Sequence, residues 1–254
     1  MLWTDALSAV PDIAALGWLW LAVLSFGAAF IRGYSGFGFA AILITGASLV
    51  TDPALLVPVV ILCELALTAP QWASIRGDID WRRVAVMFLL CLLGVPLGVR
   101  AVAALGPDMM RAAISVWVLV MGMILLRGWR MARPAGLPAH GVVGFLAGLA
   151  NGAAVGGLPV AVFFAAQPIS AAAFRATLVA YFALLDLYTV GIKAKAGLMT
   201  ATTLLLAGIG LPFMALGLRI GSSRFLAAPP EGFRRFATLV LMALAVMGLL
   251  RAAW

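Results

Sequence analysis

The stretch Arg32-Gly33-Tyr34-Ser35-Gly36-Phe37-Gly38-Phe39 interrupts a hydrophobic run, and a second interruption extends from Asn151-Gly152 to Gly156-Gly157-Leu158-Pro159. Glycine and proline weaken helices, and unpaired backbone groups are costly in hydrocarbon. Such breaks therefore persist where they are packed in protein or line a polar cavity. A corresponding pair of breaks in two halves of a chain indicates a binding site between the halves.

The composition is that of a membrane protein. Of 254 residues, 65% are hydrophobic and 10% are charged, and the mean hydropathy is +1.15. Soluble domains average about 25% charged residues. No Asp, Glu, Lys or Arg occurs in residues 13–31, 84–99, 141–174, 196–218 and 236–250. Because a spanning helix needs roughly 20 apolar residues, we predict an all-α polytopic membrane protein, multi-pass in the cell (inner) membrane.

The remaining composition excludes several other classes. The net charge of +8 fits Lys and Arg that flank membrane spans. No basic stretch is interleaved with aromatic residues, so nucleic acid is not an expected partner. Cys63 and Cys91 match no metal-ligand spacing and are expected to pack inertly, and His140 is expected at the membrane interface. Without a phosphate-binding loop or a nucleophile–His–Asp set, we predict no enzyme, no cofactor and no metal.

Apolar runs predict helical segments of uneven length. They lie at about 13–31, 36–50, 53–73, 83–104, 109–127, 140–150, 156–167, 172–193, 198–219 and 233–251. Several are too short to span a bilayer alone. If 13–50 and 140–167 each form a broken or re-entrant element, eight or nine crossings remain. The N-terminal run has no cleavage pattern and is expected to be a retained span.

An internal repeat relates the two halves. Pro107-Asp108-Met109-Met110-Arg111 recurs as Pro230-Glu231-Gly232-Phe233-Arg234, and each follows a Leu-Gly-x-Arg segment, at Leu97 to Arg100 and Leu216 to Arg219. We therefore predict one membrane domain over 1–254 with two homologous repeats, 1–130 and 139–254. Each repeat would hold about four transmembrane helices and begin with a broken or re-entrant element.

Basic residues mark candidate cytoplasmic loops. Three loops qualify, with Arg76, Arg82 and Arg83, with Arg127, Arg130 and Arg133, and with Lys193 and Lys195. Alternating crossings between these loops would make the repeats parallel. The basic 219–235 loop and the acidic N-terminus, with Asp5 and Asp12, oppose that scheme, so parallel and inverted repeats both stay open.

The first break has the residues of an anion site. Gly33, Gly36 and Gly38 allow close backbone approach, and a helix starting near Gly38 would direct free N–H groups at an anion. Tyr34 and Ser35 add hydroxyl groups, and Arg32 adds a cation. The alternative is that the glycines serve helix packing and that Arg32 reaches toward the membrane surface.

The second break follows the same logic. Pro159 suits the first turn of a helix that Gly156 and Gly157 precede, and the amide of Asn151 can donate to a ligand oxygen. Two half-helix N-termini meeting near the midplane would bind an anion without any catalytic residue. Small-residue packing alone is the alternative.

Two polar stripes complete the candidate site. Asp186, Thr189 and Lys193 share one helix face, with Arg175 three turns earlier on nearly the same line. Glu64, Thr68 and Gln71 form a similar stripe in the first half. Glu64 and Asp186 are candidate proton carriers, because membrane carboxylates facing a cavity can carry protons. Structural pairing of each carboxylate with an arginine of another helix is the alternative.

These motifs resemble the TauE/SafE family of sulfite and organosulfur anion exporters. Residues 32–40 are similar to the family's N-terminal motif, and Gly144 through Pro159 resembles its second-half pattern of spaced glycines ending in Gly-Gly-Pro-Pro. Phe174-Arg175-Ala176-Thr177, Tyr181-Phe182 and Asp186 are similar to the segment that follows. Leu158 departs from the pattern, since the family usually has a proline there. The resemblance covers both halves and implies two repeats of about four spans, no cofactor, and transport of small sulfur-containing anions.

We therefore predict a secondary transporter that moves a small sulfur-containing anion of the sulfite or sulfonate class, or an organic anion, across the inner membrane by a proton-coupled mechanism. The expected substrate contacts are Arg32, Gly33, Tyr34, Ser35, Gly36, Gly38, Asn151, Gly156, Gly157, Leu158 and Arg175. An anion channel and a membrane scaffold or enzyme without transport are the alternatives. The lipid bilayer and the anion are the expected partners, and the sequence leaves open whether the chain forms a homo-oligomer.

Overall fold

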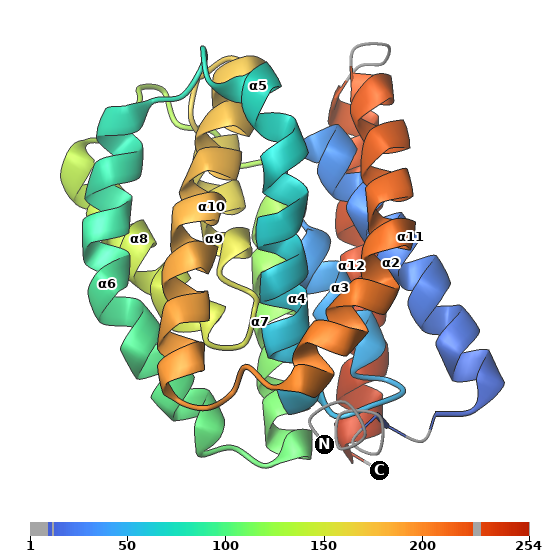
Figure 1. Cartoon of the computed structure of the whole chain (residues 1–254). Coiled ribbons are helices and arrows are strands. Elements are labelled where there is room, and N and C mark those ends of the chain that lie inside the picture. Colours follow the sequence, from blue (N-terminus) through green and yellow to red (C-terminus); the bar gives the residue numbers. More distant parts are fainter. Residues whose placement is uncertain (1–9, 12, 226–229, 254) are drawn as a thin grey trace.

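The computed structural model describes residues 10–11, 13–225 and 230–253, and all regular elements in these ranges are helical (Figure 1). The first half contains α2 (Ala15–Ser35), α3 (Phe39–Ala47), α4 (Pro53–Thr68), the 3-10 turn η1 (Ala69–Gln71), α5 (Trp72–Ile75), α6 (Trp81–Ala103) and α7 (Pro107–Arg127). The second contains α8 (Leu137–Asn151), α9 (Gly157–Ala165), α10 (Ala171–Lys195), α11 (Ala201–Phe225) and α12 (Pro230–Ala253). The sequence-based helix segments match these helices closely.

Six helical segments among the described residues are long and apolar enough to cross a membrane. They are Ala15–Ser35, Pro53–Ile75, Trp81–Ala103, Pro107–Arg127, Ala171–Lys195 and Ala201–Ser223. Leu137–Asn151 and Thr238–Ala253 are shorter apolar helices. The all-α, polytopic membrane class predicted from composition is therefore confirmed, and Leu137–Asn151 is the shorter helix that ends at the second glycine break.

The first glycine break turns α2 back into α3. Gly36 adopts a left-handed conformation (φ 82°), and its N–H donates to the carbonyl of Arg32 (2.7 Å), which ends α2. Gly38 is also left-handed (φ 90°) and caps the start of α3 at Phe39. Glycine adopts these angles without the steric cost of a Cβ. The chain rises along α2 and descends along α3 in Figure 1, forming a helical hairpin.

The second break makes a hairpin that points the opposite way. In Figure 1 the chain descends along α8, turns after Asn151 and rises along α9 from Gly157. The left-handed residue of this turn is Ala154 (φ 60°) rather than a glycine. The two hairpins therefore enter the helical body from opposite ends.

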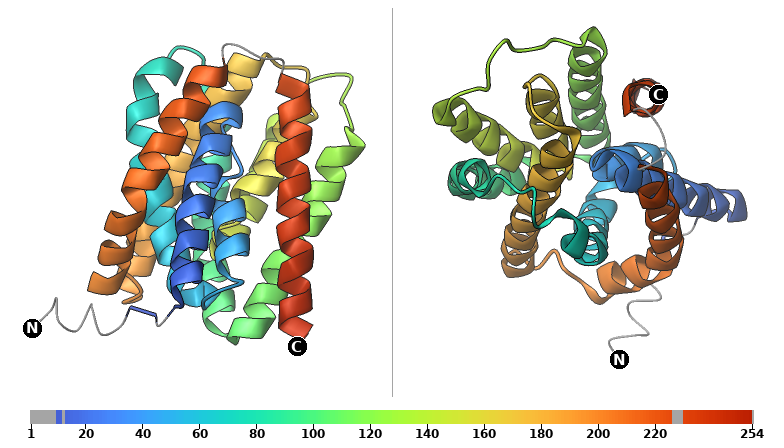
Figure 2. Two further views of the ribbon diagram at one scale, coloured as in Figure 1. Left: turned by 90° about the vertical axis from the view of Figure 1, so that its right-hand side faces the viewer. Right: turned by 90° about the horizontal axis from the view of Figure 1, so that it is seen from above.

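Glycines bring each hairpin against a helix of the other half of the chain. A Cβ on Gly98 of α6 would lie 2.0 Å from the carbonyl oxygen of Leu149 in α8. A Cβ on Gly221 of α11 would lie 2.1 Å from the carbonyl oxygen of Phe30 in α2. Backbones at this separation need small residues, as is common between membrane helices. The pairs α6–α8 and α2–α11 thus tie the two halves together, as Figure 2 shows from two further directions.

The basic loops do not share one end of the molecule, as alternating crossings would require. The α5–α6 and α7–α8 connections, with Arg76 and Arg130, lie at the upper edge of Figure 1, whereas α10 ends with Lys195 at the lower edge. The reason is that the α8–α9 hairpin returns to the end from which it entered and adds no crossing. Lys193 is also no loop residue, since it is buried and donates to the carbonyl of Gly152 (3.1 Å). Asp5 and Asp12 lie outside the described residues.

Candidate functional site

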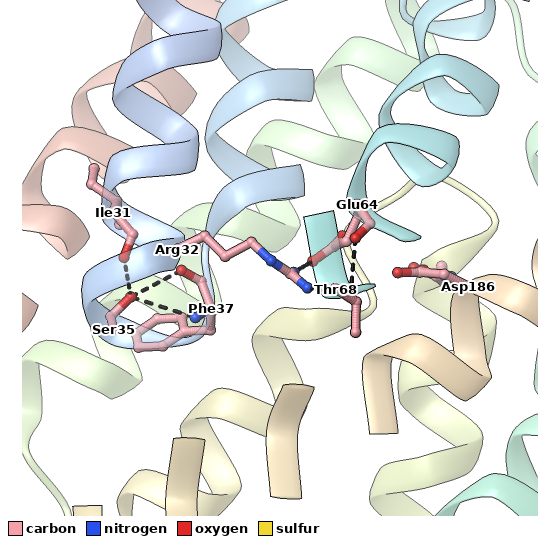
Figure 3. Close-up of polar contacts among 8 residues, drawn as sticks. Ile31, Arg32, Ser35, Phe37, Glu64, Thr68 and Asp186 are labelled. Carbon is pink, nitrogen blue, oxygen red and sulfur yellow. Dashed lines mark hydrogen bonds and ion pairs between the residues drawn. The ribbon is translucent and has the colours of Figure 1, made fainter. Parts of the chain in front are cut away.

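A first polar cluster joins α2 to α4. The side chain of Arg32 is fully buried, one turn before the end of α2. Its guanidinium forms an ion pair with Glu64 and donates through Nη2 to Oγ1 of Thr68 (2.8 Å) (Figure 3). Glu64 and Thr68 are one turn apart on α4, so both face α2. A charge buried this deeply requires such pairing, and Arg32 does not reach the membrane surface.

A second polar cluster joins α8 to α10. Asn151 is the last residue of α8, and its Nδ2 donates to Oδ1 of Asp186 (3.2 Å) and to Oγ1 of Thr189 (3.0 Å). All three side chains are at least 97% buried. Asp186 and Thr189 lie three residues apart on α10 and so share a face. In each half, the helix that follows the hairpin, α4 or α10, therefore carries a carboxylate and a threonine that bind a residue near the end of the hairpin's first helix.

The two clusters repeat one arrangement with different charges. In each, the threonine hydroxyl donates to a carbonyl one turn earlier, from Thr68 to Glu64 (3.1 Å) and from Thr189 to Leu185 (2.7 Å). That leaves the hydroxyl oxygen to accept from α2 or α8. The carboxylate of the first cluster meets a guanidinium, whereas the carboxylate of the second meets a neutral amide.

The clusters face one another across the α4–α10 contact. Figure 3 shows the carboxyl group of Asp186 directed toward Glu64 and Thr68, and Asp186 interacts electrostatically with both Glu64 and Arg32. Within the described part of the chain, Nε of Arg32 and Oδ2 of Asp186 have no hydrogen-bond partner. Buried polar groups are nearly always satisfied, so these two atoms are candidates to bind a ligand or water.

Gly33, Tyr34 and Ser35, the other predicted contact residues that precede Gly36, have packing or local hydrogen-bonding roles in the structure. Gly33 lies in α2, where a Cβ would meet the backbone of Leu218 at 2.5 Å, so this glycine serves helix packing. The hydroxyl of Ser35 bonds within the break, where its single O–H lies within reach of the carbonyl oxygens of Ile31 (2.8 Å) and Phe37 (3.0 Å). Tyr34 is buried. Ser35 therefore stabilises the turn itself, whereas Gly33 allows α2 to pack closely on α11.

Arg175 lies over the first break from the start of α10. A Cβ on Gly36 would be 2.9 Å from Cγ of Arg175, and Nη2 of Arg175 donates to Oγ of Ser222 in α11 (3.4 Å). The Arg175 side chain is half-buried and interacts electrostatically with Arg32. The first break thus brings two cations of distant sequence position together. Ser222 had no sequence signal, because it is an ordinary small residue of a spanning helix.

The second break is filled mainly by apolar packing. Leu158 is 2% exposed and belongs to an apolar cluster with residues of α3 and α4. Gly156 packs against the carbonyl of Ala147, and a Cβ on Gly157 would lie 3.2 Å from the ring of Phe182. Phe37 of the first break belongs to a different apolar cluster. The structure therefore brings Arg32, Glu64, Asn151 and Asp186 together, and the first break packs in both clusters, since Phe39 shares the apolar cluster of Leu158.

Three further residues that the sequence singled out, His140, Cys63 and Cys91, are buried outside the site. His140, expected at the interface, is fully buried, contacts the rings of Phe163 and Phe164, and hydrogen-bonds through Nδ1 with the carbonyl of Gly136 (2.9 Å). Cys63 is a buried free thiol, as is Cys91. Among the described residues no group of His, Cys, Asp or Glu has the arrangement of a metal site.

Spanning helices, two opposed hairpins and charged side chains at their centre define a multi-pass membrane protein of the kind that moves solutes. The family model described as sulfite exporter TauE/SafE matches residues 21–248, and the chain therefore belongs to this family. Members are membrane transporters, which is consistent with a chain that is not an enzyme. Neither the curated proteins nor the solved structures include a significant match.

Proposed function

We propose that this protein is a secondary transporter that moves a small sulfur-containing or organic anion, of the sulfite or sulfonate class, together with a proton. The observation that carries the proposal is the meeting of the two polar clusters between α4 and α10. Within the described residues, a buried guanidinium with an unpaired Nε and a buried carboxyl group with an unpaired Oδ2 lie there on either side of Glu64 and Thr68. A small oxyanion and a proton are complementary to these two atoms.

The charges of the site support coupling to protons. Arg32 carries one positive charge, and Glu64 and Asp186 carry two negative charges when both are ionised. An anion entering next to Arg32 would then meet excess negative charge in a medium that screens poorly. A proton on Asp186 would remove that excess. Asp186 suits this role better than Glu64, because its partner Asn151 is neutral whereas Glu64 is paired with Arg32.

The two halves are proposed to be inverted repeats, over about 1–130 and 139–254. Three observations support this assignment. The α2–α3 and α8–α9 hairpins run in opposite directions, each packs on a glycine-bearing helix of the other half, and each precedes a helix with a carboxylate and a threonine. Inverted repeats allow one site to be exposed alternately to the two sides of a membrane.

Transport by purified protein in liposomes tests the function. Radiolabelled sulfite and methanesulfonate are offered outside, with the outer solution more acidic than the lumen. We expect saturable uptake above the outside concentration, because proton and anion move together toward the alkaline side. Downhill, non-saturating flux would favour the alternative of an anion channel. If neither anion binds to the protein, raises its thermal stability or is transported by it, the proposed substrate class is wrong.

A further inference from the structure

A cleft of about 450 Å³ lies between α4 and α11, outside the two polar clusters. Its volume falls in the range of small-molecule sites, about 300–1,000 Å³. Leu67, Leu211 and Leu218 supply apolar walls, and the polar lining comes from Gln71, Arg219 and Ser222. A cleft with this lining matches an anion that carries a short apolar group.

Gln71 is the most informative residue of the cleft. It ends η1, directly after α4, and is 96% buried. Neither Oε1 nor Nε2 of its side chain has a hydrogen-bond partner within the described ranges. Burying an amide without a partner is unfavourable, so a side chain of this kind lining a cleft indicates a missing polar ligand.

The cleft is linked to the cations of the first break through Ser222. Ser222 lines the cleft and accepts a hydrogen bond from Arg175 (3.4 Å). Thr68, which holds Arg32, is three residues before Gln71 on the same face of the α4–η1 segment. Arg219, exposed on α11, stands at the cleft itself. Arg219 therefore lines the cleft, Arg175 binds Ser222 of its lining, and Arg32 binds Thr68, three residues before Gln71.

We infer that this cleft is a first binding site for the transported anion, on its way to Arg32. Nε2 of Gln71 and the guanidinium of Arg219 bind the oxyanion group, and the leucine walls bind the carbon chain of an alkyl sulfonate or related organic anion. Ser222 and Arg175 then lie between this site and the polar clusters. The inference rests on the proposed function, since it names the class of substrate and the point of its entry.

Kinetics of reconstituted protein provide one test, with ethanesulfonate as the probe. Gln71→Leu keeps the size of the side chain but removes its donor. We expect its KM to rise about tenfold with Vmax within about twofold, since a hydrogen bond to a charged group is lost. Ala215→Phe fills the cleft and should raise KM as well. Its matched control is Leu216→Phe, because Leu216 is the next residue of α11, is 55% exposed and does not line the cleft. An unchanged KM in Gln71→Leu and Ala215→Phe would overturn the inference.

Thiol labelling provides a second test that does not require transport. Ala215→Cys should react with an anionic, sulfonate-bearing thiol reagent, and ethanesulfonate should protect it. Leu216→Cys is the control for reagent reaching the lipid-facing side of α11, and the native cysteines are buried. Protection in a protein that moves no anion would reject the proposed function while supporting the cleft. Absence of protection, or protection by phosphatidylglycerol vesicles but not by ethanesulfonate, would overturn the cleft as an anion site.

Discussion

The Arg32–Glu64–Thr68 cluster and the Asn151–Asp186–Thr189 cluster have the same hydrogen-bonding geometry but differ in charge. In both, the residue before a helix break donates to a carboxylate and to a threonine of a later helix. The first carboxylate is neutralised by its partner, and the second is not. The carboxyl group in each case is buried among apolar helices.

This difference in charge suits the two clusters to different roles in transport. An ion pair fixes charge in place, because removing either partner leaves a buried charge uncompensated. A carboxyl group beside a neutral amide can gain or lose a proton without breaking such a pair. The first cluster is therefore suited to hold a cation for the anion, and the second is suited to exchange a proton.

The largest effect is expected from Arg32→Ala. It leaves Glu64 buried without its cation, which should lower the free energy of unfolding by about 3–5 kcal/mol. Sulfite uptake should fall by a factor of roughly 10–100, because hydrogen bonds to charged groups contribute about 1.5–3 kcal/mol. Thermal unfolding in detergent and flux in liposomes measure the two effects.

Two further variants make this result specific to charge. Arg32→Gln combined with Glu64→Gln removes both charges and should recover much of the lost stability without restoring uptake. Asn151→Ala removes two neutral-donor contacts and should cost only about 1–3 kcal/mol. If Asn151→Ala destabilised the protein as much as Arg32→Ala, charge would not be what distinguishes the two clusters.

Asp186→Asn should abolish the response to a pH gradient. The amide oxygen of the new side chain can still accept from Asn151, so we expect folding to be preserved. The variant has no proton to exchange at this position, and its sulfite flux should be the same with and without an acidic outer solution. Glu64→Gln should instead lower stability and anion affinity while the remaining flux still responds to the gradient. The reverse pattern would assign the proton to Glu64.

Local signals predicted most of the fold. Glycine and proline breaks and uncharged runs gave helix positions close to those of α2–α4 and α6–α12, because these signals depend on neighbouring residues. The contacts of the site could not be predicted in this way. Arg32 and Glu64 are 32 residues apart in the sequence, and Asn151 and Asp186 are 35 residues apart. Helix periodicity predicts which residues share a face of one helix, but it does not predict which faces of different helices meet. Gln71 was visible as part of a polar stripe, but only packing against α11 places it in a cleft.

Substitutions in the two hairpin interfaces should lower thermal stability equally, in contrast to substitutions in the two polar clusters. Gly98→Ala in α6 and Gly221→Ala in α11 each force a Cβ against a backbone carbonyl of the partner helix, that of Leu149 or of Phe30. Overpacking of this kind typically costs about 1–3 kcal/mol, and we expect similar losses in thermal stability for the two variants. Gly208→Ala in α11 is the matched control, since a Cβ there meets no atom within 4 Å. It should raise stability by up to about 1 kcal/mol, because alanine favours helix. Unequal losses at Gly98 and Gly221 would mean that the halves differ in packing as well as in charge, and would weaken their assignment as repeats.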